Sequence, residues 1–370
     1  MERLKPLEHW FKAVFFRIFS VFLKRGRKGF QPIDGDSIKR IIFLRPEKIG
    51  DMVISLPVFD GLTKAYPNIR VSVLGSPRNR VLIAEDARFE KLFMYTKNVW
   101  KDFFTLLSMR RERYDCVVDM ICDDSVTTLF LSQMIAAGSP RIGIGKRKYR
   151  AYYDYNDDHR MGDTGHIIEN TLRLLDAFGI DSRQVSGYAH PYISAQDEQR
   201  ANEIMQDIRN GSRIVPCVGY NVSAGARTRI WPEEKSLELL RAIRNHDPAC
   251  QVILLTVDQD RCRAERLRRE FENGVHIVPP GLSLLAATAL ISRLELLISP
   301  DTSLIHIARS FKVPVVGLYS RFMKNFLLWK PFGQERGAVV SGNDDNIFDI
   351  TVKQVFETFK DVYSAREPVR

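Results

Sequence analysis

Residues 299–308 (SPDTSLIHIA) combine polar and apolar positions in a pattern that could hold a phosphate group. The apolar run 294–298 leads into them and predicts a buried strand, and apolar residues resume at helical spacing from Leu304. A strand, a short polar loop and a helix N-terminus bring unpaired backbone N–H groups and the positive end of the helix dipole to one point. Because a further strand-like run follows at 313–319, we predict a nucleotide site in an α/β domain.

A second polar loop carries small residues and arginines in a pattern suited to an anion. Residues 221–232 read NVSAGARTRIWP, in which Ser223, Ala224 and Gly225 would let backbone N–H groups approach a ligand, and Arg229 adds positive charge. An exposed surface loop with two arginines would have the same composition, so both interpretations stand. Neither GxGxxG nor GxxxxGKS/T occurs, so neither a dinucleotide fingerprint nor a P-loop is indicated.

Asp51 is a third position whose residue type could do chemistry. It ends the sequence KIGD, which follows one predicted strand and opens a predicted helix. A carboxylate there can accept hydrogen bonds from the free N–H groups of the first helical turn. It can also act as a general base if it faces a ligand. The spacing of the residues leaves both roles open.

Alternating apolar runs and helical patterns predict the elements that position these loops. Predicted strands cover residues 40–44, 71–74, 116–121, 214–220, 251–256, 275–278, 294–298 and 313–319. Predicted helices cover residues 52–66, 195–209, 232–245, 261–272, 282–292 and 352–364. This alternation is typical of βαβ units and parallel sheets, whose ligands bind beyond the carboxyl ends of the strands.

Length, charge and cysteine content narrow the class of protein. A chain of 370 residues exceeds one comfortable core, so we expect two domains. The net charge of +10 favours anionic partners, but no RRM, KH, zinc-finger or helix-turn-helix pattern occurs, so we predict no nucleic acid partner. Five cysteines without a CxxC pair indicate a reducing cytoplasm and neither a disulfide framework nor a metal site. We predict no metal and no other cofactor.

The first residues have the composition of a membrane-surface helix. Residues 4–28 place many aromatic side chains beside one polar stripe, and a basic cluster follows at 24–28. Lys12 and Arg17 interrupt the apolar run, so no uncharged stretch is long enough to span a bilayer, and no small-residue cleavage site indicates a signal peptide. We expect a helix in the interface of an anionic membrane, and a helix packed on the protein's own core is the alternative.

Several of these segments resemble the motifs of glycosyltransferase family 9, the ADP-heptose:lipopolysaccharide heptosyltransferases. The stretch RPEKIGDMVISLPVFDGLTKAYP, from Arg45, is similar to a first motif with R-x-x-x-x-GD and a helix ending near YP. The stretch SPDTSLIHIARSFKVPVVGLYS, from Ser299, is similar to a second motif, (N/P)DTG-x-x-H-x-A followed by KP-x-(V/I)-x-L(F/Y)G. NVSAGARTRIWPEEK and the WKPFG from Trp329 match in the same order. The likeness covers about residues 39–340.

The resemblance implies a GT-B fold, with two Rossmann-like parallel-sheet domains facing a central cleft, to which this chain adds the N-terminal amphipathic helix. The expected division is a helix and linker at 1–38, an acceptor-binding domain at 39–194, a linker helix at 195–211, a nucleotide-sugar donor domain at 212–345 and a C-terminal helix at 346–370. Ligand contacts would then come from both domains.

The resemblance also implies a reaction, which is inverting, metal-independent transfer of heptose from ADP-heptose to a lipopolysaccharide core acceptor. The expected partners are the nucleotide-diphosphate sugar, a lipid-linked saccharide and an anionic membrane surface. The enzyme would lie in the cytoplasm, peripheral on the inner face of the cell membrane. The alternatives are another nucleotide-diphosphate sugar used for O-antigen or another surface glycan, and a binding protein without activity on the same scaffold.

Family positions fall on individual residues of this chain. Asp51 falls on the catalytic base. The expected donor-binding residues are Ser223, Ala224, Gly225, Arg229, Asp260, Asp301, Thr302, Ser303 and His306. Of these, Arg229 stands where a phosphate-contacting lysine is usual, Ser303 replaces the usual glycine, and either Asp258 or Asp260 would meet the ribose. His306 either points into the site or makes a buried hydrogen bond. The expected acceptor-binding residues are Lys48, Arg78, Lys146 and Arg147.

Overall fold

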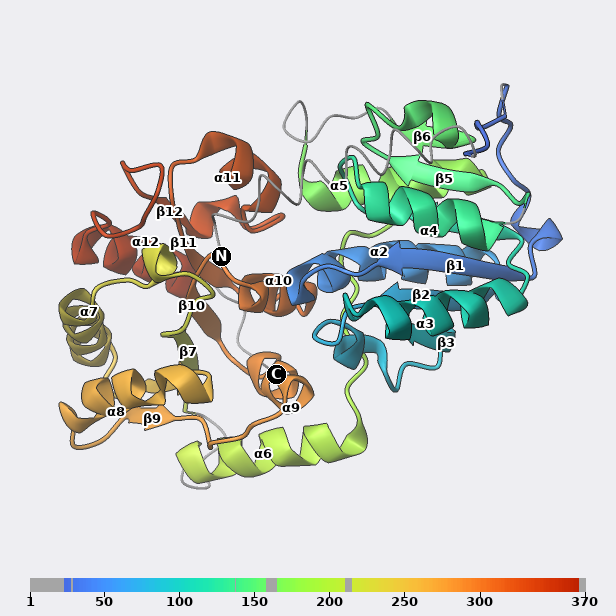
Figure 1. Ribbon diagram of the computed structural model, residues 1–370. Coiled ribbons are helices and arrows are strands. Elements are labelled where there is room, and N and C mark those ends of the chain that lie inside the picture. The colour runs from blue at the N-terminus through green and yellow to red at the C-terminus, as the bar shows by residue number, and fades with distance from the viewer. Residues whose placement is uncertain (1–22, 28, 137, 158–164, 210–214, 366–370) are drawn as a thin grey trace. The chain divides into compact units, whose positions relative to one another are not determined.

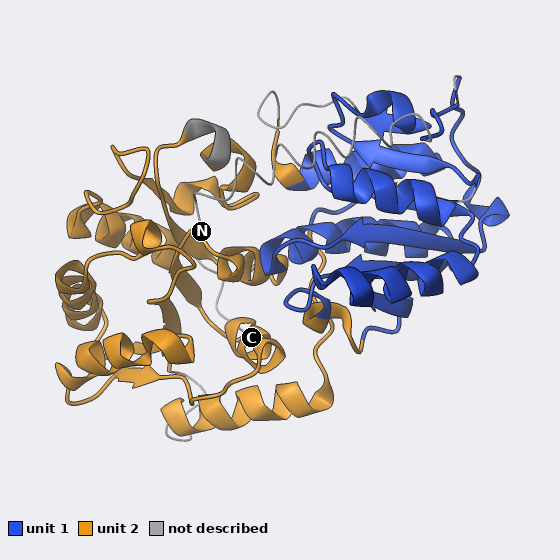
Figure 2. Cartoon of the chain, viewed as in Figure 1, with its two compact units in different colours: residues 1–80, 86–164, 168–187 blue, residues 81–85, 165–167, 188–370 orange. Residues whose placement is uncertain are grey.

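The computed structural model describes residues 23–27, 29–136, 138–157, 165–209 and 215–365 (Figure 1). The chain divides into two compact units, coloured separately in Figure 2. Unit 1 comprises Met1–Arg80, Asp86–Thr164 and Ile168–Gly187, and unit 2 comprises Val81–Glu85, Gly165–Ile167 and Tyr188–Arg370. Each unit is built on one six-stranded parallel sheet.

The sheet of unit 1 has the strand order β3-β2-β1-β4-β5-β6. Its strands are β1 (Arg40–Arg45), β2 (Arg70–Gly75), β3 (Phe89–Met94), β4 (Cys116–Asp119), β5 (Arg141–Ile144) and β6 (Tyr155–Asp157). The central strands are buried on both faces, which explains their continuous β-branched and aliphatic sequences. Both faces must therefore be covered by helices.

The described residues of this part of the chain contain four α-helices: α2 (Ile49–Ala65), α3 (Val99–Arg111), α4 (Val126–Ala136) and α5 (Ile167–Leu172). Helices α3 and α4 cover one face of the sheet, where Leu106, Met109 and Ile135 pack on Ile42 and Val117. Helix α2 covers the other face and is buried along most of its length. Phe59 of α2 meets Phe43 of β1 edge to face, with ring centroids 5.0 Å apart.

Unit 2 repeats the same topology with the order β12-β11-β10-β7-β8-β9. Its strands are β7 (Cys217–Asn221), β8 (Gln251–Leu255), β9 (Val275–Ile277), β10 (Leu296–Pro300), β11 (Val315–Tyr319) and β12 (Ala338–Val340). Its helices are α6 (Ala195–Arg209), α7 (Glu233–His246), α8 (Arg261–Arg269), α9 (Leu284–Ile291), α10 (Ser303–Ser310), α11 (Met323–Trp329) and α12 (Val352–Ser364). Helices α7, α8 and α12 contribute to one apolar core with the sheet.

The predicted α/β class with two parallel sheets is confirmed, but the helices α3, α4, α5 and α11 and several strands were not predicted. The strands β3, β6 and β12 were not predicted because they are edge strands that are short or carry charged residues. Strand β5 was also missed, since its four residues are too few to show a period. Strand β10 continues to Pro300, so only Asp301 and Thr302 separate it from α10.

The helix expected over residues 4–28 lies largely outside the described residues. The described residues 23–27 are not helical and follow the surface of unit 1. There the backbone N–H of Arg27 donates to Asp154 Oδ1 at 2.8 Å, and that of Lys24 donates to Gln133 Oε1 at 3.2 Å. Within the described residues, the helices are all too short or too polar to cross a bilayer.

A buried polar cluster lies under α10 in unit 2. Two residues of α10, His306 and Arg309, are almost fully buried, and the Arg309 guanidinium lies 5.1 Å from the Tyr188 ring centroid. His166 Nε2 bonds the Lys330 carbonyl at 2.8 Å. Burial, reinforced by His166 and Arg309, lowers the pKa of His306 to about 3, and burial also lowers the pKa of His166 to about 3. Both imidazoles are therefore neutral at physiological pH.

These two histidines should make the stability of unit 2 depend on pH. In the unfolded chain each histidine takes up a proton below its ordinary pKa of 6.5, while the folded protein resists protonation down to about 3. The free energy of unfolding is therefore highest above pH 6.5, and it falls as the pH drops from 6.5 towards 3. From about pH 7 to about pH 5, each histidine should lower the free energy of unfolding by about 2 kcal/mol.

We expect His306→Gln to reduce this loss by about 2 kcal/mol in urea unfolding followed by tryptophan fluorescence at the two pH values. An NMR titration of the wild-type imidazoles gives an independent measurement that needs no variant. A titration midpoint of either His306 or His166 between pH 5 and pH 7 would contradict the assignment.

Candidate active site

In each sheet the strand order reverses beside the first strand, and the candidate loops of each unit lie beyond the reversal in that unit's own sheet. Strand β1 pairs with both β2 and β4, and β7 pairs with both β8 and β10, all in parallel. At such a switch point the connections leave in opposite directions beyond the carboxyl ends of the two central strands, which opens a crevice there. The loop after β1 carries Asp51, and the loops after β7 and β10 carry Arg229 and Asp301.

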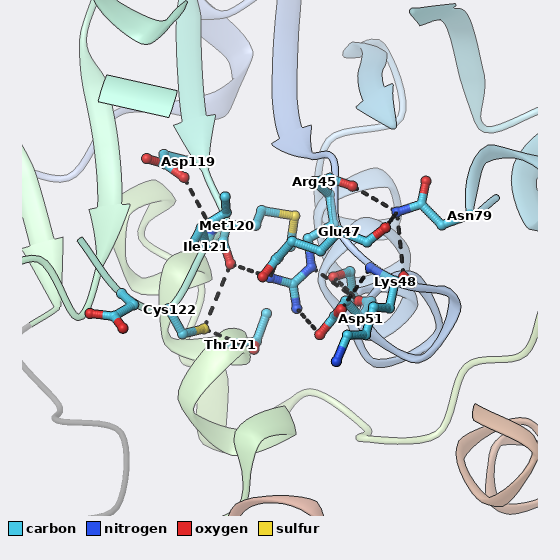
Figure 3. A network of polar contacts seen from close by, with 12 residues as sticks. Arg45, Glu47, Lys48, Asp51, Asn79, Asp119, Met120, Ile121, Cys122 and Thr171 are labelled. Atoms are coloured by element: carbon cyan, nitrogen blue, oxygen red, sulfur yellow. Dashed lines mark hydrogen bonds and ion pairs between the residues drawn. The ribbon is translucent and has the colours of Figure 1, made fainter. Parts of the chain in front are cut away.

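The switch point of unit 1 is filled by Arg45, the last residue of β1 (Figure 3). Its side chain is 1% exposed. Nη1 donates to the Met120 carbonyl just after β4 at 2.5 Å and to Glu47 Oε2 at 2.6 Å, and Nε donates to the Asp51 carbonyl at 3.1 Å. One guanidinium therefore joins the ends of β1 and β4 to the first turn of α2.

Asp51 lies in the first turn of α2, beside this guanidinium, and is 8% exposed. Its Oδ2 accepts the backbone N–H of Lys48 at 2.8 Å, which is the helix-capping contact that the sequence allowed. Its Oδ1 lies 3.7 Å from Arg45 Nη2 and accepts no hydrogen bond from a described residue. The carboxylate is thus held in place through one oxygen, while the other keeps its capacity to accept a proton.

The charges around Asp51 act on one another. Burial alone would lower the pKa of Arg45, but the carboxylates of Glu47 and Asp51 outweigh it and raise that pKa, so the guanidinium stays charged. Burial raises the pKa of Glu47, against the opposing effect of Arg45 and with a further rise from Asp51. Arg45 is the cation that allows two carboxylates to share this nearly closed space.

Lys146 takes a different place from the one predicted for an acceptor-binding residue. Its ammonium is buried and lies 2.9 Å from Asp119 Oδ2, and it donates to the carbonyls of Ile121 and Asp123 at 2.7 and 2.9 Å. The Tyr153 hydroxyl donates to the same Asp119 oxygen at 2.6 Å. The contacts of Lys146 with Asp119, Ile121 and Asp123 use all three protons of its ammonium. Lys146 therefore stabilises the end of β4 and has no proton left to donate to a ligand.

The other predicted acceptor-binding residues, Lys48, Arg78 and Arg147, are exposed. Lys48 and Arg78 follow neighbouring strands, and the buried amide of Asn79 ties their loops together by donating to the Arg45 carbonyl at 2.8 Å. Arg147 lies in the turn after β5. Sequence reasoning gave no role to Arg45 or Asn79, because most of the groups to which they donate are backbone carbonyls.

The switch point of unit 2 is also bridged by the last residue of its first strand. Asn221, which ends β7, donates from Nδ2 to Ser299 Oγ at 2.9 Å and to Thr302 Oγ1 at 3.1 Å. Its Oδ1 accepts the backbone N–H of Ser223 at 3.1 Å. Asn221 was not predicted as a site residue, yet it connects three of the predicted segments. Its position at the end of a buried strand was the available signal.

The small-residue loop after β7 is anchored at its start and open at its tip. Ser223 Oγ lies 3.1 Å from Thr256 Oγ1 and accepts the Val257 N–H at 3.3 Å, which anchors the loop to the end of β8. Ala224 is partly exposed and Gly225 is exposed. A Cβ added to Gly225 would meet no heavy atom within 4 Å, so the described structure leaves its backbone accessible.

Arg229 and Asp301 meet across the same switch point. Arg229 Nη1 donates to the Asp301 carbonyl at 2.8 Å and lies 3.4 Å from Asp301 Oδ2. About a third of the Arg229 side chain is exposed, and its Nε and Nη2 contact no described acceptor. The guanidinium is therefore oriented by one nitrogen and presents two others to an incoming anion.

The start of α10 lies beside Arg229 and Asp301, while the predicted site residues His306 and Asp260 lie apart from them. Thr302 is the N-cap residue and Ser303 the first helical residue, so the helix dipole points its positive end at the Asp301–Arg229 pair. His306 is neutral and buried below, and its Nδ1 has no partner among the described residues. Asp260 opens α8 beyond β8, and its carboxylate bonds no described residue. Asp258, the alternative, accepts the Gly281 N–H at 3.3 Å.

The described residues contain no group of three His, Cys, Asp or Glu side chains placed to hold a metal ion. The polar groups gathered in unit 2 are thus backbone N–H groups, hydroxyls and one arginine, which together suit a phosphate group. Those of unit 1 centre on a carboxylate, which suits proton transfer.

Comparisons with known proteins find related sequences and similar folds. The chain is 20% identical to the lipopolysaccharide core heptosyltransferase OpsX of Haemophilus influenzae over 78% of this chain and 81% of that protein. A family 9 glycosyltransferase from Veillonella parvula superimposes with a TM-score of 0.75 at 18% identity, over 90% of this chain and 99% of the other.

The Escherichia coli heptosyltransferase WaaC, solved with ADP-2-deoxy-2-fluoro heptose, gives a TM-score of 0.67 at 17% identity, over 87% and 99% of the two chains. Likenesses at this level of identity show a shared GT-B fold. The model of glycosyltransferase family 9 (heptosyltransferase) matches residues 106–353, which is more than half of the sequence. The chain therefore belongs to glycosyltransferase family 9 and is a glycosyltransferase.

Proposed function

We propose that this glycosyltransferase transfers a heptose from ADP-heptose to a lipopolysaccharide core acceptor, with inversion at the anomeric carbon. One observation carries the proposal: a nearly buried carboxylate occupies one switch point, and an arginine beside a helix N-terminus occupies the other. The similarity to OpsX, a lipopolysaccharide core heptosyltransferase, supports the acceptor, and the WaaC complex with ADP-2-deoxy-2-fluoro heptose supports the donor.

In the proposed reaction Asp51 is the general base. The acceptor hydroxyl attacks the anomeric carbon from the face opposite the diphosphate, and its proton passes to the carboxylate as the new C–O bond forms. Asp51 Oδ1 is the oxygen we assign to this proton, since Oδ2 already accepts the Lys48 N–H. Arg45 and Lys48 hold the carboxylate in one orientation, so little reorganisation is needed at the moment of transfer.

The leaving group is the nucleoside diphosphate. As the bond from the anomeric carbon to the phosphate oxygen breaks, negative charge grows on the diphosphate and must be stabilised. The free nitrogens of Arg229, the backbone of the loop 223–225 and the first N–H groups of α10 supply positive potential in one place. Asp301 orients Arg229, and Asp260 is placed to accept from a ribose hydroxyl.

The acceptor side of the proposal rests on the exposed cations of unit 1. Lys48 precedes Asp51 in the loop after β1, Arg78 lies in the loop after the neighbouring strand β2, and Arg147 adds charge after β5. Such cations fit an acidic or phosphorylated saccharide. Because that saccharide is attached to a lipid, we place the enzyme in the cytoplasm, peripheral on the inner face of the cell membrane.

The function can be tested with a donor screen. The full chain is incubated with a heptose-free lipopolysaccharide core fragment and ADP-heptose, or with UDP- or GDP-sugars, and both nucleotide release and the mass of the acceptor are followed. We expect one heptose to be added with ADP-heptose only. Transfer from a UDP-sugar alone would show that the protein is a glycosyltransferase that does not use the proposed donor.

The assignment of Arg229 predicts a loss of donor affinity. Arg229→Ala should weaken ADP binding by about 10- to 100-fold in isothermal titration calorimetry, since a hydrogen-bonded charge contributes about 1.5–3 kcal/mol. Arg229→Lys should recover part of this loss because it keeps the charge. The matched control is Arg227→Ala in the same 3₁₀ turn, whose exposed side chain forms no hydrogen bond or ion pair with a described residue. Equal ADP affinity in Arg229→Ala and wild type would rule out the phosphate role.

A further inference from the structure

Helix α3 exposes an unusual concentration of large apolar side chains. Val99 is 80% exposed, Trp100 75%, Phe104 64% and Phe103 47%. These four stand within six consecutive residues, whereas the other exposed large apolar side chains of the described residues are scattered through the sequence. Single exposed apolar residues are ordinary, but a contiguous group marks a surface that is covered in use.

The spacing of these residues shows that α3 has a second apolar face. Leu106 and Met109 point inward and belong to the core of unit 1. Trp100, Phe103, Phe104 and Leu107 follow the i, i+3, i+4, i+7 pattern that places side chains on one side of a helix. The rings of Phe103 and Phe104 touch edge to face, with centroids 5.8 Å apart. A helix of a globular protein needs only one apolar stripe to pack on the core. The second, outward-facing apolar stripe of α3 therefore requires another explanation.

Cations surround this outer face. Lys97, Lys101, Arg110 and Arg111 are exposed, and none of them forms an ion pair with a described residue. The neighbouring acids are already engaged, since Asp102 accepts the Thr96 N–H at 2.7 Å and Glu112 pairs with Lys91 at 2.6 Å. Aromatic side chains surrounded by lysines and arginines complement the interface of a bilayer with anionic headgroups.

The topology places the first turns of α3 at the carboxyl edge of the sheet of unit 1, where the candidate site residues of that unit lie. Helix α3 follows β3, so its aromatic first turns lie at the carboxyl edge of the sheet, as Asp51 and Arg78 do. Strand β3 is two strands from β1, or about 10 Å. The Tyr95 N–H donates to the Gly75 carbonyl at 2.8 Å and ties the end of β3 to that of β2.

We propose that the outer face of α3 docks on an anionic phospholipid bilayer. Trp100, Phe103 and Phe104 enter the interface, and the surrounding lysines and arginines contact lipid phosphates. This orientation presents the carboxyl edge of unit 1 to the saccharide of a lipid-anchored acceptor. The inference rests on the proposed function in taking the acceptor to be lipid-anchored, and it assigns the contact to described residues that are separate from the segment 4–28.

The binding test compares the full-length wild type with a Trp100→Glu/Phe104→Glu double variant. Co-sedimentation with phosphatidylglycerol/phosphatidylethanolamine vesicles should show at least a tenfold weaker partition for the variant. Both side chains are exposed, so the circular dichroism spectrum and melting temperature should not change. Phe348→Glu, at an exposed phenylalanine of unit 2, is the matched control and should bind as the wild type does.

Insertion of α3 can be measured directly even if another segment also binds lipid. Brominated phosphatidylglycerol should quench Trp100, read as the difference between wild type and Trp100→Phe. Absence of this quenching would overturn the inference. The inference would also be overturned if the wild type were a dimer, the double variant were a monomer, and both bound vesicles equally. The outer face of α3 would then be an interface between two copies of the chain.

A transfer assay separates failure of this inference from failure of the proposed function. The double variant should keep the wild-type rate with a water-soluble core saccharide and lose at least tenfold with the same saccharide anchored in vesicles. Equal rates on the anchored acceptor would contradict the role of α3. No transfer by the wild type to either acceptor would contradict the proposed function, and quenching of Trp100 would still decide whether α3 enters the bilayer.

Discussion

A buried polar side chain at the end of the first strand holds each switch point of this protein together. In unit 1 the Arg45 guanidinium joins β1, the residue after β4 and the first turn of α2. In unit 2 the Asn221 amide joins β7, β10 and the N-cap residue of α10. Both groups are nearly inaccessible to water, so removing either would leave buried donors or acceptors without partners, at about 1–3 kcal/mol each. Arg45 contacts the candidate base Asp51, and Asn221 contacts Thr302 and Ser223 of the candidate phosphate site.

The two switch points share a topology and differ in chemistry. The first presents a carboxylate on a helix that is buried along most of its length, which is a rigid support for a proton acceptor. The second presents small residues, an arginine oriented by an aspartate, and a helix N-terminus, which suit a diphosphate. Glycosyl transfer needs both functions, a base for the attacking hydroxyl and positive potential for the leaving group. Membership of glycosyltransferase family 9 agrees with this division.

The sequence predicted those features that depend on local pattern. Buried central strands such as β8 and β11 are continuous apolar runs, and Asp301 and Thr302 interrupt such a pattern at a loop. Features that depend on distant partners were not predictable: Arg45, Asn79 and Asn221 act through residues from other loops. Lys146 was predicted to bind the acceptor, but it pairs with Asp119 and is buried. Helix α3 was not predicted, so its exposed apolar face was not anticipated either.

The central claim is that Asp51 takes the proton of the acceptor, and one substitution tests it most directly. Asp51→Asn keeps the shape of the side chain and an oxygen for the Lys48 N–H but removes the basic group. The rate of heptose transfer should fall about 100- to 10,000-fold, while ADP affinity and the melting temperature stay close to wild type. Asp60→Asn, at a carboxylate of the same helix that pairs with Lys64, should transfer normally. Transfer by Asp51→Asn at the wild-type rate would contradict the account.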